Sequence, residues 1–128
     1  MIKKTIKYVD YNGVERTEDF YFNLTKAEVT EMEVSAKGGM KNLIERIIAE
    51  KDAKRIMEIF KEIIVKSYGV KSLDGKRFIK SPEVLDEFTQ SEAYSELFIE
   101  LASNEEKAIE FVNGVMPRIP NEKSEINK

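Results

Sequence analysis

Three pairs of acidic residues are the groups in this sequence best suited to acid–base chemistry. Carboxylates that lie close together can take up and release protons in a general acid–base reaction. The pairs are Glu31 with Glu33, Asp86 with Glu87, and Glu105 with Glu106. Each pair falls on the polar side or in the first turn of an expected helix, where acidic side chains are solvated and favour the helix dipole. We therefore expect surface positions rather than an active site.

Other motifs for catalysis or cofactor binding are missing from the sequence. It contains no histidine and no cysteine, so it lacks the usual base near neutral pH, the commonest zinc ligand and a thiol. Asp74-Gly75 lacks the repeated acidic residues of a calcium loop, and no serine lies in a G-x-S-x-G elbow. We expect no enzymatic activity, no metal and no cofactor.

The composition predicts a globular protein that does not bind nucleic acid. The 128 residues are 41% hydrophobic and 35% charged, which suffices for a core without metals or disulfides. The net charge is −3, and acidic and basic residues alternate in pairs such as Glu62 with Lys66 instead of forming a basic face. The sequence shows neither the apolar core of a signal peptide nor an apolar run of about 18 residues. We expect a soluble protein of a reducing compartment, without membrane contact.

Residues 2–24 have the pattern of a β-hairpin with one apolar face. Apolar residues alternate along both strands, with Ile2, Ile6 and Tyr8 on the first and Phe20, Phe22 and Leu24 on the second. Between them, Asn12-Gly13 predicts a type I′ turn, in which both residues have positive φ. A two-stranded hairpin is not stable alone, so this one must pack on helices or join another sheet.

Residues 25–116 predict five or six amphipathic helices. Gly38-Gly39 should end the first helix, and apolar residues at helical spacing follow in five stretches, residues 40–48, 56–64, 84–88, 94–102 and 108–115. Expected helix starts are the capping boxes Thr25–Glu28, Thr89–Glu92 and Ser103–Glu106, with Asp52 and Ser81-Pro82 as further caps. The fold class is therefore α+β and mostly helical. We expect one domain over residues 1–117 and a disordered polar tail over residues 118–128.

Three consecutive aromatic residues, Phe20, Tyr21 and Phe22, cannot all point inward from one strand. Tyr21 either covers a neighbouring helix or belongs to an exposed surface beside an open strand edge, which could accept another strand. Both alternatives stay open. The partner-binding candidates are Tyr8, Tyr11, Phe20, Tyr21, Phe22, Tyr94 and Phe98.

Three long segments resemble the tail assembly chaperones of long-tailed phages and prophages of Gram-positive bacteria. They read "YVDYNGVERTEDFYFNLTKAEVTEME", "IFKEIIVKSYGVKSLDGKRFIKS" and "FTQSEAYSELFIELASNEEKAIEFVNGVMP". The resemblance covers residues 2–117. It rests on the order of these segments, because none of them contains a catalytic signature.

The resemblance implies a non-enzymatic protein that keeps the tape measure protein soluble and helps tail tube protein polymerise around it. Such proteins act in the host cytoplasm and are absent from the mature virion. Many also have a longer, frameshifted product. The alternatives are a structural tail or connector component that forms a ring in the virion, and a small DNA-binding regulator, which the charge pattern does not favour. A homo-oligomer is compatible with the chaperone role and with the structural component.

Overall fold

The computed structural model describes residues 1–35, 45, 49 and 51–117. The predicted stop at Gly38-Gly39, most of the helix at residues 40–48 and the tail at 118–128 lie outside these residues. The elements in chain order are β1 (Ile2–Val9), β2 (Glu15–Phe22), α1 (Lys26–Ser35), α3 (Ala53–Ser67), β3 (Tyr68–Lys71), β4 (Phe78–Ile79), α4 (Pro82–Thr89), α5 (Glu92–Ser103) and α6 (Glu105–Val115). The prediction of an α+β, mostly helical fold with an N-terminal hairpin is confirmed.

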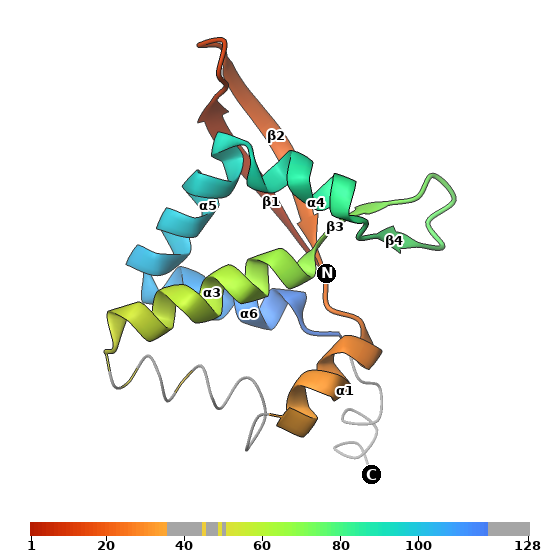
Figure 1. Ribbon diagram of the computed structural model, residues 1–128, viewed down its shortest axis with the longest axis vertical. Coiled ribbons are helices and arrows are strands. Elements are labelled where there is room, and N and C mark those ends of the chain that lie inside the picture. Colours follow the sequence, from red (N-terminus) through yellow and green to blue (C-terminus); the bar gives the residue numbers. More distant parts are fainter. Residues whose placement is uncertain (36–44, 46–48, 50, 118–128) are drawn as a thin grey trace.

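The hairpin is part of a larger sheet than the sequence indicated. Four antiparallel strands follow the order β1-β2-β3-β4, and β3 pairs with the end of β2 through Tyr21 with Gly69 and Phe22 with Tyr68. The strand edge beside Tyr21 is therefore occupied. The sequence missed β3 because its four residues follow α3 directly and lack an alternating pattern. Figure 1 shows the long β1–β2 hairpin extending past α4 and α5, while the short β3–β4 pair projects to one side.

The hairpin turn differs from the predicted type I′ turn. Of its two central residues only Gly13 has a positive φ, of 81°. The amide of Gly13 donates to the carbonyl of Asp10, and the amide of Asp10 donates to the carbonyl of Val14. This is a three-residue connection with glycine in the left-handed position. The Asp10 side chain explains the change, because it accepts from the amides of Asn12 and Val14 and from Arg16.

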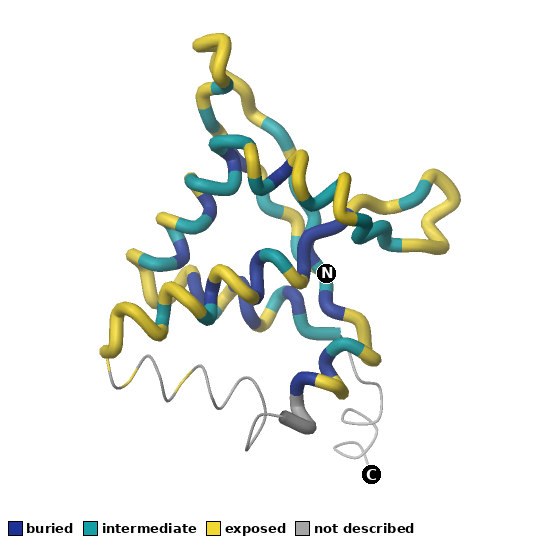
Figure 2. The backbone as a smooth tube through the Cα atoms, in the orientation of Figure 1, coloured by how far each residue is buried: buried dark blue, intermediate teal, exposed yellow. Residues whose placement is uncertain are grey.

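The core lies between the sheet and the helices (Figure 2). The apolar residues predicted to face inward on the hairpin and on α3, α5 and α6 are largely buried there. The bulkiest fully buried side chains are Phe22, Phe60, Phe88, Phe111, Leu24, Ile63, Ile64, Leu97 and Leu101. Burial of such side chains contributes about 1.5–3 kcal/mol each, so this cluster is the main stabilising feature of the fold.

Three predicted helix caps are confirmed and two are wrong. The Thr25–Glu28 box, the Asp52 cap and the Ser81 cap form the expected hydrogen bonds. The helix α5 begins instead after Ser91, and α6 begins after Asn104. The reason is local: the Ser103 hydroxyl donates backwards to the carbonyl of Ile99, so it is not available as a cap, and the Asn104 side chain accepts from the amide of Lys107.

Candidate docking groove

Six of the seven aromatic candidates are at least partly buried. Phe22 is completely buried and offers no surface to a partner. The side chains of Tyr8, Phe20, Tyr94 and Phe98 are half-buried against the core. Tyr11 alone is largely exposed, with 76% of its surface accessible, and its hydroxyl donates to the carboxylate of Glu92 over 3.1 Å.

The half-buried candidates form a row of rings that joins the hairpin to α5. Tyr8 lies 6.5 Å from Phe20, Phe20 lies 5.2 Å from Phe88, Phe88 lies 5.8 Å from Tyr94, and Tyr94 lies 6.1 Å from Phe98, all between ring centroids. Phe88 is the central member, although its place in a stripe on α4 predicted only a core position. Aromatic pairs at these distances stabilise packing, so this row is a structural element first.

Tyr21 lies on the other face of the sheet, away from this row. The ammonium group of Lys71 sits 4.7 Å from the centroid of its ring, at a distance typical of cation–π contacts. Because β3 also pairs with the backbone of Tyr21, the hypothesis of an open edge at this residue does not fit the structure. The ring is half-buried rather than freely exposed.

An apolar groove of about 350 Å³ lies elsewhere, between the start of α3, the end of α5 and the start of α6. Its residues come from the start of α3 and from the junction of α5 and α6, which are distant in the sequence and meet at one end of the bundle (Figure 1). They are Lys51, Ala53, Ile56, Met57, Phe60, Leu101, Ala102, Ser103, Glu105 and Ala108. The floor is made by buried Phe60, Leu101 and Ala108.

The chemistry of the groove suits an apolar helix. Alanine side chains in its wall allow another backbone to approach closely, and Met57 is 43% exposed. Methionine is flexible and polarisable, and surfaces that bind varied apolar partners use it often. Lys51 and Glu105 place one charge of each sign among the lining residues. An amphipathic helix could lay its apolar face here and keep its polar face in water.

The sequence did not reveal this groove as a site. Met57 falls outside the apolar stripe of α3, which Ile56, Phe60 and Ile64 follow, and it had no assigned role. A methionine next to the stripe, on the solvent side, was the only available signal. The alanines do not indicate a site in the sequence, because small residues are common in helices. They line a groove only because three helices cross at this point.

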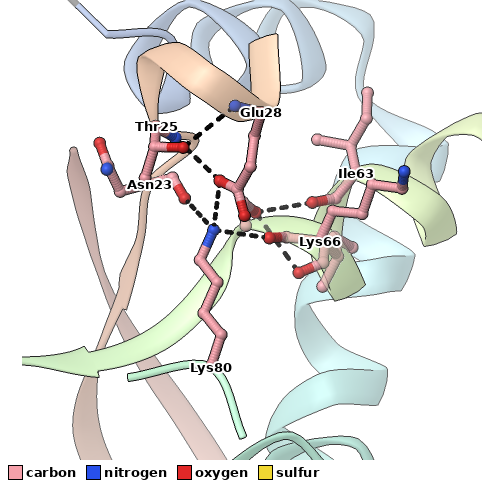
Figure 3. A network of polar contacts seen from close by, with 8 residues as sticks. Asn23, Thr25, Glu28, Ile63, Lys66 and Lys80 are labelled. Atoms are coloured by element: carbon pink, nitrogen blue, oxygen red, sulfur yellow. Dashed lines mark hydrogen bonds and ion pairs between the residues drawn. The ribbon is translucent and has the colours of Figure 1, made fainter. Parts of the chain in front are cut away.

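A cluster of polar contacts around Lys80, shown in Figure 3, fixes α1 to the rest of the fold. The ammonium group of Lys80 donates to the carboxylate of Glu28 over 2.7 Å and to the carbonyls of Asn23 and Lys66 over 2.8 Å each. Burial alone would raise the pKa of Glu28, but the hydrogen bonds from Lys80 and from the amide of Thr25 outweigh it and lower that pKa. We call this cluster the Lys80 clasp.

The acidic pairs considered for catalysis are surface groups wherever the structure describes them. The side chains of Glu31, Asp86, Glu87, Glu105 and Glu106 are all exposed. Among the described residues no cluster of three acidic side chains could hold a metal ion. Within the same part of the chain, no helix has the length and apolar character needed to cross a membrane.

The comparison with protein families decides the class of the protein. A family model described as "Phage tail assembly chaperone" matches residues 1–126. The chain belongs to this family. Searches of curated proteins and of solved structures found no match. Membership of a phage tail assembly chaperone family, predicted from the three sequence segments, is thus confirmed, and the role that goes with it is assembly of a phage tail, which suggests a non-enzymatic protein.

Proposed function

We propose that this tail assembly chaperone binds the tape measure protein of a long-tailed phage or prophage of a Gram-positive bacterium. It keeps that protein soluble in the host cytoplasm and promotes polymerisation of tail tube protein around it. It acts by non-covalent binding and leaves before the virion is complete. The observation that supports this proposal is the apolar groove between α3, α5 and α6, in a protein whose family serves tail assembly.

The groove matches what such a partner requires. A tape measure protein is long, helical and apolar, so its segments need temporary cover for apolar side chains. The floor of Phe60 and Leu101 supplies an apolar contact, and the exposed side chain of Met57 can adapt to different residues. A groove of about 350 Å³ takes only a few side chains, and an interface of that size stays reversible. Reversibility is necessary because the chaperone must release its partner.

The test is co-expression with the tape measure protein of the same gene cluster, followed by a solubility assay and affinity purification. The variant Met57→Glu places a charge in the groove, whereas Ile99→Glu makes the same change at a side chain that is 60% exposed and does not line the groove. We expect the wild type and Ile99→Glu to keep the tape measure protein soluble and to elute with it. Met57→Glu should lose both effects.

Two results would count against the proposal. If the tape measure protein remains insoluble with the wild-type chain, the chaperone does not act on it. If the protein is present in stoichiometric amounts in purified particles, a structural tail or connector component is the better description. Size measurement of the purified protein, alone and with tail tube protein, decides whether it acts as a homo-oligomer.

A further inference from the structure

The β3–β4 arm, residues 70–79, projects from the molecule and takes no part in the groove. Figure 1 shows it extending away from the helices, and Figure 2 shows that most of it is exposed. Its two strands pair through Val70 with Ile79 and through Lys71 with Phe78. A projecting two-stranded arm is normally unstable in isolation, so its order requires anchors at the base and the tip.

The base of the arm is fixed by close packing. The ring of Phe78 lies directly over Gly69, so that a Cβ atom at this glycine would come within 2.6 Å of the ring. Lys71 contacts the ring of Tyr21 on the neighbouring strand. Lys80, at the end of the arm, is held in the Lys80 clasp and also lies 5.7 Å from the centroid of Phe78. These contacts hold the arm in one orientation relative to the sheet.

The tip is fixed by five hydrogen bonds around Ser72 and Asp74. The amide of Ser72 donates to the carbonyl of Arg77 over 2.9 Å, and the amide of Gly75 donates to the carbonyl of Ser72 over 3.0 Å. The Ser72 hydroxyl donates to Asp74 and accepts from the amide of Arg77, while Asp74 accepts from the amide of Lys76. The tip is therefore pre-organised, and binding would cost little ordering entropy.

This rigid tip holds apolar side chains in the solvent. Leu73 is fully exposed, at 109% of its reference surface, and Val70 is 42% exposed. With Ile79 they line an open hollow of about 610 Å³ on the arm. A single exposed leucine on a protein surface needs no explanation. A leucine held out by an ordered loop, next to two further apolar side chains and a hollow, is the arrangement of a docking element.

The charge of the arm indicates what docks there. The chain as a whole has more acidic than basic residues, 24 against 21, but the arm contains Lys71, Lys76 and Arg77 against a single acidic residue, Asp74. Among the described residues, no carboxylate forms an ion pair with the side chain of Lys76 or Arg77. Arg77 lines the hollow together with Lys71 and Asp74, and Lys76 precedes it in the exposed tip, so both cations are available to a partner.

We propose that the β3–β4 arm docks an acidic protein segment that inserts an apolar side chain against Val70, Leu73 and Ile79. Carboxylates of the segment pair with Lys76 and Arg77, and the apolar anchor fills the hollow. The partner must therefore carry both acidic side chains and an apolar anchor. This requirement distinguishes it from a purely apolar helix, which the groove suits better. The arm thus gives the protein a second binding surface, independent of the groove.

The first test uses the full chain in cells that express the complete tail gene cluster. The photo-crosslinking residue p-benzoylphenylalanine replaces Leu73 in one variant and Ile99, an equally apolar exposed position on α5, in the control. We expect crosslinks from position 73 to map to one segment rich in aspartate and glutamate that also has an apolar residue. Crosslinks to a neutral or basic segment, to nucleic acid, or equally from position 99 would overturn the proposal.

The second test measures affinity for that crosslinked segment, synthesised as a peptide, by fluorescence polarisation. Leu73→Ser and the double variant Lys76→Glu/Arg77→Glu should each weaken binding about tenfold or more, and added salt should weaken wild-type binding. Met57→Glu should bind the peptide as the wild type does, because the groove is separate. Equal affinity of all four proteins would exclude the arm. Failure of the tape measure proposal would leave these results unchanged, so the two failures are distinguishable.

Discussion

The rings of Tyr68 and Phe88 stack with their centroids 4.4 Å apart and their planes 18° apart. Tyr68 begins β3 at the end of α3, and Phe88 lies on α4, so this stack joins the sheet to the helices that cover it. Phe88 is 2% exposed and also contacts Phe20 and Phe22. The sequence placed Phe88 correctly in an apolar stripe, but only the unexpected strand β3 brings Tyr68 to it.

Replacing Phe88 with alanine should therefore destabilise the protein strongly. The change removes a buried ring and leaves a cavity among four aromatic neighbours, which typically costs about 3–5 kcal/mol of unfolding free energy. Phe98→Ala is the matched control, because Phe98 is only half-buried at the end of the aromatic row. Urea denaturation measures both variants. An equal loss for the two would show that the row, and not the centre of the core, determines stability.

The Lys80 clasp should make the unfolding free energy depend on pH. The pKa of Glu28 is lowered below its ordinary value of 4.5, so the folded protein binds this proton less readily than the unfolded chain. The resulting stabilisation is present above pH 4.5 and is lost as the pH falls through the folded pKa. Glu28→Gln removes the titrating group. We expect the difference in unfolding free energy between the wild type and this variant to shrink on acidification.

Other carboxylates also titrate in this range, so the comparison between variants is the measurement that matters. Asp10 has a lowered pKa because of its hydrogen bond with Arg16, and Asp74 because of its hydrogen bond with Ser72. Both remain in Glu28→Gln and contribute equally to the two curves. A difference that stays constant between pH 7 and pH 3 would show that the charge of Glu28 plays no part in the clasp.

Thr25 and Ser91 each precede a helix, but they should contribute differently to stability. Thr25 accepts from the amide of Glu28, and its own amide donates to the Glu28 carboxylate. Thr25→Ala should cost about 1 kcal/mol of unfolding free energy, the usual loss for a helix cap. Ser91 precedes α5 but its side chain caps no amide of that helix. Ser91→Ala should cost less, and thermal or urea denaturation of the pair checks the order.

Local patterns predicted the elements well because their causes lie within a few residues. The Thr25–Glu28 box and the Asp52 cap each join residues three positions apart. The same reasoning failed at Asn12, where the side chain of Asp10 stabilises a different turn, and at Ser103, whose hydroxyl is already bound to Ile99. In both cases a competing side-chain hydrogen bond nearby decided the outcome.

The candidate sites were less predictable because they depend on contacts between distant residues. The groove exists only where Met57 on α3 comes to lie beside Ala102 on α5. The arm exists because Phe78 packs over Gly69, and a glycine after a helix reads in the sequence as a helix stop. Three consecutive aromatic residues, Phe20 to Phe22, predicted an exposed ring, but adjacency does not say which ring faces the core, and Phe22 belongs to it.

The contact of Gly69 with Phe78 gives the sharpest test of how the arm is held. A Cβ atom at position 69 would lie 2.6 Å and 2.8 Å from two carbons of the Phe78 ring, so Gly69→Ala must displace that ring. Overpacking of this kind costs about 1–3 kcal/mol, and hydrogen exchange at the amide of Ser72 should accelerate as the arm loosens. In a Phe78→Leu background the clash is smaller, so the same glycine change should cost less. A double-mutant cycle by urea denaturation measures this coupling. An equal cost of Gly69→Ala in both backgrounds would show that the ring does not fix the base of the arm.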